Sequence, residues 1–447
     1  MDYTRQSSVF DQAILRNSRV VLVGDSMVSD YALLYMAGLG IGNITLVQQN
    51  HRQRHLFKKP LERLISEINP EIRLNTAANA GSIGPADVVA DFTNNEASKQ
   101  AACEYAGKAR LFVSASSDDI SASIYAGYSG EKGHACLETA AMRRYNGKEQ
   151  GSFSSGLIAA IALDEIRKAL LGLEGDEAVS GVLNYNLFAK GRFFRKMSIA
   201  DSVRAEKAVS FPRLKSGRVL VVGAGGIGTY AALNLACLRI PFDVYDGDDI
   251  DATNLNRQVL YYDAIGRNKA AVLKQRLESL LGANMRAFGR FFDENEAKTA
   301  GKKYSAVLSC VDNWGARELL SRYAVANNIV LIDAGVGPFT ARLDIYNHNI
   351  CLECRRGNVE QASTQPQACN TMQESNIVMC NAFAGAMMAA ELGASLTGLE
   401  SSGRQMLYFS KKQLTEKVSY LPAERQCACN IIRGCKCHKQ GGAIERL

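Results

Sequence analysis

Four glycines near the middle of the chain have the spacing of a loop that holds phosphate groups. They lie in the stretch VLVVGAGGIGTYA and are Gly223, Gly225, Gly226 and Gly228. Such a turn needs glycine because it is tight and because phosphate oxygens must approach the backbone closely. The apolar run before the loop predicts a buried parallel strand. A helix from about Thr229 would then point its positive end at the phosphates.

A carboxylate and two cations follow the glycines. Asp246 ends the next predicted strand at roughly the distance, about 20 residues, at which a carboxylate binds ribose hydroxyls in dinucleotide sites. Arg257 and Lys269 come later, within NLNRQ and GRNK. Two cations suit a triphosphate better than a diphosphate linker. The segment therefore favours ATP over NAD.

Asp312 and Asn313 follow the apolar run AVLSCV. Open α/β sheets place their chemistry at the carboxyl ends of strands, and an Asp there can hold Mg²⁺ against phosphates. Alone, Asp312 could equally be a strand-end cap. Together with the glycines, Arg257 and Lys269 it favours a metal site.

The stretches GAGGIG, DIDATNLNRQ, GRNK and CVDN resemble the nucleotide site of the ThiF, MoeB and ubiquitin-activating superfamily, over residues 215–430. Those enzymes use ATP and Mg²⁺ to adenylate a carboxylate, usually the C-terminal glycine of a ubiquitin-like or sulfur-carrier protein. The resemblance implies Asp246 on the ribose and Asp312 on Mg²⁺. It also implies phosphate or neighbouring nucleotide contacts for Arg257, Lys269, Asp248, Asn254 and Asn313.

The first half of the chain reads as a degenerate copy of the second. VVLVGDSMVSDYA repeats VLVVGAGGIGTYA without its glycines, and Gly24 lies 199 residues before Gly223. Aligned by eye, Thr93 falls on Asp312 and Asn94 on Asn313, and Glu165 falls on Glu391. Gln48 stands in for Asp246, and Cys136 and Thr139 stand in for Cys351 and Cys354. The order is kept, which indicates an internal repeat.

One element of the first half has kept a family feature. The segment YTRQ, residues 3–6, resembles the segment before the first helix of the inactive half in ubiquitin-activating enzymes. In that family its arginine reaches the nucleotide phosphates of the active half, so the resemblance implies this role for Arg5. A terminal arginine with no function is the alternative.

These patterns predict an α/β protein of two tandem Rossmann-like ThiF-type domains packed as a pseudo-dimer. We expect a degenerate domain at residues 1–200, a linker at 201–215, an active adenylation domain at 216–426 and a cysteine-rich tail at 427–447. The linker prediction rests on the loss of apolar periodicity there.

The cysteines permit two kinds of site. Cys351, Cys354, Cys427 and Cys429 could form a four-thiolate structural Zn²⁺ site. The family has two CxxC pairs, but the second pair here is CxC, so Cys435, Cys437 or His438 could replace one member. Free thiols are the alternative. Cys369 lies in the loop where some relatives carry a catalytic cysteine, although no histidine is near it, and Cys380 is expected in the core.

Composition limits partners and location. The chain has 447 residues, 47% of them hydrophobic, and a net charge of +7 spread along its length. We therefore expect no nucleic-acid partner. No apolar run has the ~18 residues of a membrane span, and the N-terminus lacks a signal core, so we expect a cytoplasmic protein. A further homodimer stays open.

The function predicted is ATP- and Mg²⁺-dependent adenylation of a carboxylate, with a ubiquitin-like or sulfur-carrier protein as the first substrate candidate. The alternative is a ribosomal precursor peptide in microcin- or pantocin-type antibiotic maturation. A non-catalytic scaffold is disfavoured by the intact GxGGxG loop, Arg257, Lys269 and Asp312. An NAD-dependent oxidoreductase is disfavoured by NLNRQ and by the missing hydride-site residues.

Overall fold

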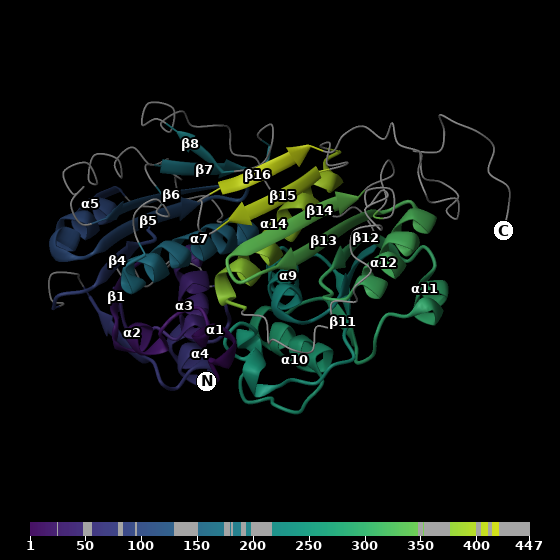
Figure 1. Ribbon diagram of the computed structural model, residues 1–447, viewed down its shortest axis with the longest axis horizontal. Coiled ribbons are helices and arrows are strands. Elements are labelled where there is room, and N and C mark those ends of the chain that lie inside the picture. Colours follow the sequence, from purple (N-terminus) through teal and green to yellow (C-terminus); the bar gives the residue numbers. More distant parts are fainter. Residues whose placement is uncertain are drawn as a thin grey trace.

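The computed structural model describes residues 1–24, 26–47, 56–78, 84–93, 96–128, 151–173, 179, 182–188, 194–197, 217–346, 352, 376–398, 404–409 and 414–419. It shows an α/β protein with two eight-stranded sheets (Figure 1). The predicted fold class, two Rossmann-like units in one chain, is confirmed.

The first sheet uses residues 19–197. Its strands are β1 (Arg19–Val23), β2 (Asn43–Val47), β3 (Arg73–Ala77), β4 (Val88–Asp91), β5 (Leu111–Ser117), β6 (Ser121–Tyr128), β7 (Val182–Asn186) and β8 (Arg195–Met197). The helices of this half are α1 (Thr4–Ser7), α2 (Gln12–Asn17), α3 (Met27–Leu39), α4 (Leu61–Ile68), α5 (Glu96–Tyr105), η2 (Ala106–Lys108) and α7 (Ser152–Leu171).

The second sheet uses residues 218–419. Its strands are β9 (Arg218–Val222), β10 (Phe242–Tyr245), β11 (Met285–Phe288), β12 (Tyr304–Ser309), β13 (Val330–Val336), β14 (Thr340–Tyr346), β15 (Arg404–Phe409) and β16 (Leu414–Ser419). Its helices are α9 (Gly226–Cys237), η3 (Ala252–Asn254), η4 (Val259–Tyr261), α10 (Lys269–Leu281), α11 (Glu294–Ala300), α12 (Trp314–Asn327) and α14 (Val378–Leu396).

The two sheets have the same topology. The strand order is β3-β2-β1-β4-β5-β6-β7-β8 in one and β11-β10-β9-β12-β13-β14-β15-β16 in the other. In each, the first five strands in this order are parallel and the last three join as antiparallel neighbours. Two copies of one fold therefore stand in one chain.

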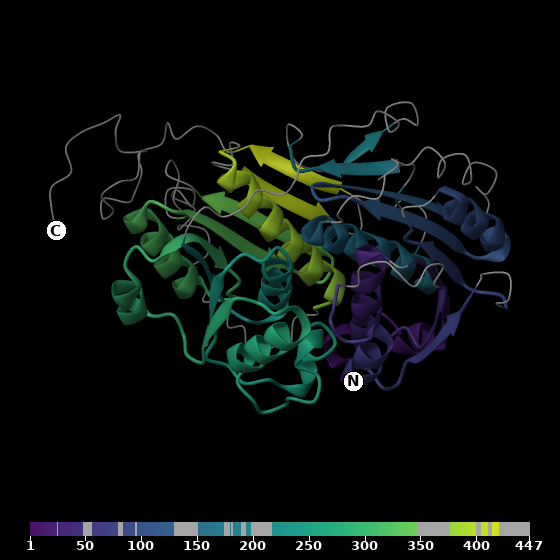
Figure 2. The same cartoon turned by 180° about the vertical axis from the view of Figure 1, so that it is seen from behind.

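Four helices join the halves. Figures 1 and 2 show α3, α7, α9 and α14 between the two sheets. Helix α9 packs against α14, α14 against α7, and α7 against α3. Gly385 permits this close approach, because a Cβ there would lie 2.6 Å from the backbone nitrogen of Ala231. One hydrophobic core runs through both halves as a result.

The register of the sheets corrects one pairing expected between the halves. Val23 pairs with Asp91, and its counterpart Val222 pairs with Ser309. Asp91 is therefore equivalent to Ser309, and α5 and α12, which begin at Glu96 and Trp314, keep the same spacing. Counting along the chain places Asp312 on Asn94, and the alignment of Asp312 with Thr93 was wrong by one residue. An alignment of the apolar residues alone does not locate the last residue of each strand. The hydrogen-bonded register does, and it places the strand ends at Asp91 and Ser309.

A buried ion pair confirms the corrected register, with its partners exchanged. In the first half Asp91 on β4 pairs with Lys99 Nζ at 2.7 Å and accepts from Ser114 on β5. In the second half the serine is on the first strand and the aspartate on the next: Ser309 donates to Asp333, which pairs with Arg317 at 2.8 Å. Both halves thus keep one carboxylate, one hydroxyl and one helix cation at this point.

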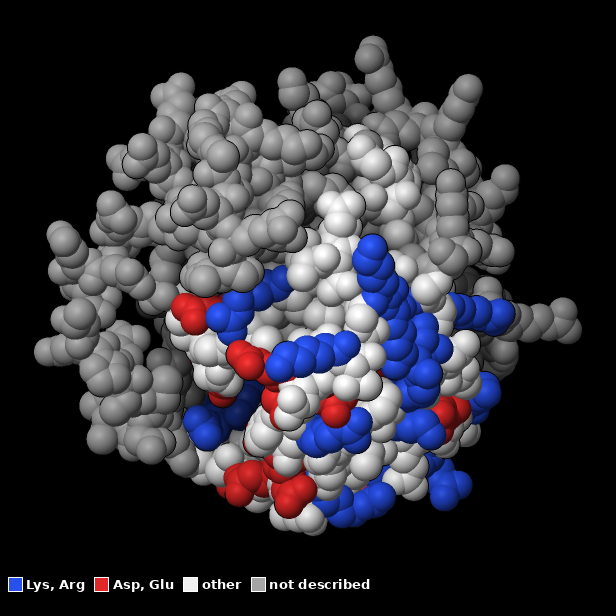
Figure 3. Space-filling model, turned by 90° about the vertical axis from the view of Figure 1, so that its right-hand side faces the viewer, with Lys and Arg blue, Asp and Glu red and all other residues white. Residues whose placement is uncertain are grey.

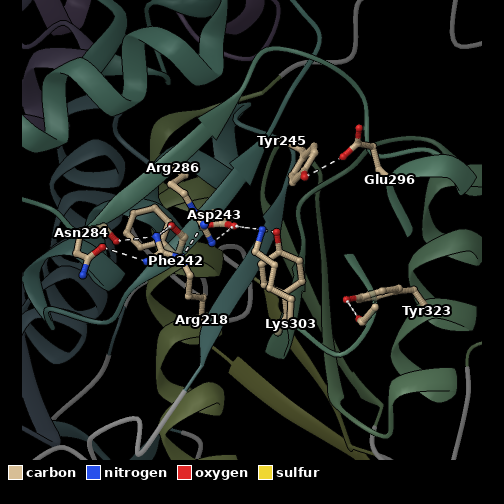
Figure 4. Close-up of polar contacts among 11 residues, drawn as sticks. Arg218, Phe242, Asp243, Tyr245, Asn284, Arg286, Glu296, Lys303 and Tyr323 are labelled. Carbon is tan, nitrogen blue, oxygen red and sulfur yellow. Dashed lines mark hydrogen bonds and ion pairs between the residues drawn. The ribbon is translucent and has the colours of Figure 1, made fainter. Parts of the chain in front are cut away.

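The amino ends of the second sheet carry a different charged cluster (Figure 4). Asp243 accepts hydrogen bonds from Arg218 at 2.6 Å, from Arg286 and Tyr304 at 2.8 Å each, and pairs with Lys303 at 3.1 Å. Burial opposes ionisation of Asp243, but these donors outweigh it and lower its pKa. The cluster holds four strands together, because Arg218, Asp243, Arg286 and Tyr304 belong to β9, β10, β11 and β12. Figure 3 shows basic side chains on this end of the molecule interspersed with acidic ones.

Candidate active site

The glycine loop lies between β9 and α9, and its glycines have different tasks. Gly223 has φ +94°, and a Cβ there would lie 2.5 Å from the carbonyl oxygen of Cys310. A Cβ on Gly228 would lie 1.9 Å from the carbonyl oxygen of Gly223. Gly225 faces open space, since the nearest atom is Gln258 Nε2 at 3.9 Å. Packing therefore requires Gly223 and Gly228, while Gly225 leaves room for a ligand.

Helix α9 begins at Gly226, three residues before the predicted start. Its N-cap is Gly225, which offers no side-chain cap. The N–H groups of a first helical turn have no partner within the helix and carry a partial positive charge. The loop thus presents an uncapped helix end of the kind that binds phosphate.

Asp246 holds this loop in place. One carboxylate oxygen accepts the Ala224 N–H at 2.6 Å and the other accepts the Asp248 N–H at 2.8 Å. Burial raises the pKa of Asp246, and these two N–H groups and Lys269 oppose the rise. Each oxygen keeps a further lone pair, so the carboxylate can also accept from ribose hydroxyls.

Lys269 and Asn254 each contact a residue of the segment that follows β10, residues 246–251. Lys269 starts α10, and its Nζ pairs with Asp248 at 3.0 Å. Asn254 ends η3, where its side chain accepts the Asp251 N–H at 3.1 Å and completes a capping box. Both side chains have a local structural task besides any contact with a nucleotide.

Arg257 and Arg5 bring two positive charges together. Arg257 is 6% exposed and donates to the carbonyl oxygen of Thr253 at 2.6 Å and to Asn256 at 3.1 Å. Burial lowers its pKa to about 10, and the charge of Arg5 contributes to the fall. Like charges at a buried site favour a bound anion.

The segment that carries Arg5 docks on the second half. It forms α1, where Gln6 accepts a hydrogen bond from Asn256 Nδ2 at 3.1 Å and the Arg5 carbonyl accepts the Asn376 N–H at 3.1 Å. Arg5 Nε is buried and has no hydrogen-bond partner among the described residues. The α1 segment is therefore held against the second half, and Arg5 Nε remains a hydrogen-bond donor without a partner among the described residues.

Asp312 and Asn313 are adjacent but have separate surroundings. Asn313 is the N-cap of α12 and accepts the Ala316 N–H at 2.9 Å. Asp312 is exposed and makes no hydrogen bond or ion pair with the rest of the described chain. The cap that the sequence permitted for Asp312 is supplied by Asn313, so the Asp312 carboxylate is available to a cation.

A polar residue of α14, Asn381, lies against the glycine loop and was not predicted from the sequence. Asn381 is 1% exposed. A Cβ on Gly226 would lie 2.1 Å from Asn381 Oδ1, and this oxygen has no partner among the described residues. The available signal was one asparagine within the apolar run VMCNAFAGAMM.

The cysteine predictions are only partly reached by the structure. Cys369 and the four predicted zinc ligands, Cys351, Cys354, Cys427 and Cys429, lie outside the described residues. Within the described ranges no group of three or more His, Cys, Asp or Glu residues could hold a metal ion. Cys380 is 1% exposed, as expected of a core residue, and burial raises its pKa.

The repeated Rossmann-like sheets and the glycine loop at β9 define the class of this protein, and comparison with known proteins gives the family. The chain belongs to the ThiF family, whose model matches residues 195–431. The match covers the second sheet and leaves most of the first half unmatched, so the internal repeat and the shared topology identify that half as a copy.

Curated relatives share this region. The adenylyltransferase and sulfurtransferase UBA4 of Vanderwaltozyma polyspora is 30% identical over 245 residues, 53% of this chain and 55% of that protein. The sulfur carrier protein ThiS adenylyltransferase of Escherichia coli K12 is 28% identical over 225 residues, 50% of this chain and 88% of that protein. The chain spans about half the length of the first relatives it matches.

Two solved structures resemble the chain weakly. MccB of E. coli with ATP has a TM-score of 0.42 and 21% identity, covering 50% of this chain and 67% of that one. PaaA has a TM-score of 0.39 and 21% identity, covering 47% and 74%. Among the described helices, none is long and apolar enough to cross a membrane.

Proposed function

We propose that the protein adenylates a substrate carboxylate with ATP and releases pyrophosphate. The observation that carries this is the closeness of the Arg5 charge to buried Arg257, whose neighbour Gln258 faces Gly225 at the uncapped start of α9. Two cations and a row of free N–H groups at one point call for a polyanion such as a triphosphate. The relatives named adenylyltransferases support the same chemistry.

Each site residue is proposed to act on a different part of the nucleotide. A carboxylate oxygen of the substrate attacks the α-phosphorus, and the bond to pyrophosphate breaks. Arg5, Arg257 and Lys269 neutralise the phosphates and the leaving pyrophosphate, while Asp246 orients the ribose. The step needs alignment and charge stabilisation more than covalent help from the protein.

Asp312 is the residue proposed to hold Mg²⁺. Its exposed carboxylate, uncommitted among the described residues, fits a hard cation that takes one protein ligand and phosphate oxygens. When bound, Mg²⁺ would neutralise phosphate charge. A structural Zn²⁺ on Cys351, Cys354, Cys427 and Cys429 stays a prediction, and metal analysis should give about one zinc per chain, the single ion that one four-thiolate site holds.

The first half is proposed as the inactive member of a pseudo-dimer. It supplies Arg5 through the contacts of α1 with Asn256 and Asn376. The proposed substrate is the C-terminus of a ubiquitin-like or sulfur-carrier protein. The second candidate, proposed from the sequence, is a ribosomal precursor peptide of a microcin- or pantocin-type antibiotic. As a separate proposal, Cys369 then accepts the acyl group.

The test is ATP–pyrophosphate exchange with the pure protein. Candidate substrates are the products of neighbouring genes, either a small β-grasp protein that ends in Gly-Gly or a short precursor peptide. Exchange should require one of them and Mg²⁺, and should fall strongly in Asp312→Ala. Binding of ATP without any exchange would contradict the proposal and favour a scaffold.

A further inference from the structure

Asn381 carries an acceptor that no group of the described protein uses. Its Nδ2 donates to the Ile377 carbonyl at 2.7 Å and to Asn376 Oδ1. The bond to the Ile377 carbonyl fixes the amide orientation, because the reverse would bring Oδ1 against a carbonyl oxygen. Oδ1 is thereby turned toward Gly226, buried and unpaired.

The residue of the first half that is equivalent to Asn381 has a hydrogen-bond partner within the protein. Helices α7 and α14 align with Ser155 on Asn381, and the Ser155 hydroxyl pairs with Ser117 at 2.8 Å. A buried acceptor without a donor costs about 1–3 kcal/mol. Only the half with the open glycine loop keeps this cost, which points to a ligand that donates a hydrogen bond here.

The nucleotide is a poor partner for this oxygen. Phosphate oxygens at the glycine loop only accept hydrogen bonds at neutral pH. The ribose hydroxyls are proposed to reach Asp246, and the adenine amino group lies beyond the ribose. The second substrate supplies a donor near the reaction. The last residue of a peptide chain has its N–H two bonds from the carboxyl carbon.

We propose that Asn381 Oδ1 accepts the backbone N–H of the last residue of the substrate chain, and so selects a peptide C-terminus. This rests on the proposed adenylation. The contact would align the attacking carboxylate with the α-phosphate above Gly226. A substrate whose last residue lacks an N–H, such as a terminal proline or an ester-linked residue, would be disfavoured.

The decisive experiment changes the substrate, not the protein. A synthetic peptide ending in Gly-Gly is compared with the same peptide whose last amide is an ester, in wild-type exchange assays. The ester should lower kcat/KM for the peptide by about 10- to 100-fold, as expected when a buried acceptor is left unpaired. The KM for ATP should not change. Equal use of amide and ester would overturn the proposal.

Variants then assign the effect to Asn381. In Asn381→Leu the two peptides should be used equally within about threefold, the size of a weak hydrogen bond, while calorimetry shows unchanged ATP binding. Ser155→Ala, the matched change in the first half, should keep the wild-type preference. A preserved preference in Asn381→Leu would contradict the assignment. If wild type gives exchange with no peptide or carrier protein, the proposed function fails and this inference with it.

Discussion

The amino-terminal ends of α3 and α9 occupy equivalent positions, and only one of them is open. In α3, Ser26 caps the helix and forms a capping box with Ser29, and its hydroxyl also donates to the Phe92 carbonyl. In α9 the equivalent residues are Gly225 and Gly228, and no side chain caps the helix. The first half therefore binds the N–H groups of Ser26 and Ser29 with its own hydroxyls, whereas the equivalent glycines of the second half have no such partner.

This difference explains how one copy can lose a site and keep the fold. A capped helix end is more stable by about 1 kcal/mol than an uncapped one. Ser26 and Ser29 thus replace ligand binding with folding stability in the first half. The second half leaves its helix end uncapped, and Asn381 Oδ1 is buried there without a partner among the described residues.

The largest expected effect concerns the exchanged ion pair. Asp333→Ser should destabilise the second half by about 3–5 kcal/mol, because Arg317 would stay buried without its carboxylate. The double variant Ser309→Asp, Asp333→Ser recreates the first-half arrangement and should recover at least half of the loss, about 2 kcal/mol. Urea unfolding measures both. A double variant as unstable as the single one would contradict the equivalence of the two networks.

Substitutions of Asp312 and Asn313 should separate an effect on the reaction from an effect on stability. Asp312→Ala should lower exchange by about 100- to 1000-fold, the loss of several kcal/mol of charge stabilisation, with an unchanged melting temperature. Asn313→Ala should instead lower the free energy of unfolding by about 1 kcal/mol through loss of the cap. Exchange assays and thermal melts compare them. Normal exchange in Asp312→Ala would remove the proposed metal ligand.

Gly225→Ser moves the first-half cap into the second half. The side chain has room, and its hydroxyl would bind the N–H groups proposed for phosphate. ATP affinity should fall by about tenfold or more, while stability rises by up to about 1 kcal/mol. Calorimetric titration and melting test this. Gly107→Ser, at an open position of the first half, is the control. Unchanged ATP binding would mean that the loop is not the phosphate site.

Arg5→Ala tests whether the first half contributes to the site of the second. A phosphate-facing charge lost should reduce ATP turnover by about tenfold, or ~1.4 kcal/mol. Arg5→Lys should recover part of it. Arg16→Ala, an exposed arginine paired with Glu71, is the matched control and should behave as wild type. No change in Arg5→Ala would make the arm structural only.

The sequence predicted the features that local pattern encodes. The glycine loop, Asp246 after its strand and the alternation of strands and helices all lie within short windows, where spacing and apolar runs carry the signal. The duplication was visible because both halves keep their apolar patterns. The alignment of Asp312 failed by one residue, since apolar letters do not mark the last hydrogen bond of a strand.

The tertiary structure decided which side chains meet at the loop. Gln6 contacts Asn256 across 250 residues of chain, and Asn381 reaches Gly226 from a helix that begins 152 residues later. No local period relates such positions, because the first contact depends on the docking of α1 on the second half and the other on the packing of α14 against α9. The sequence by itself determined the kind of loop this protein has. Packing decided that buried Asn381 Oδ1, unpaired among the described residues, lies against Gly226 at the uncapped end of α9.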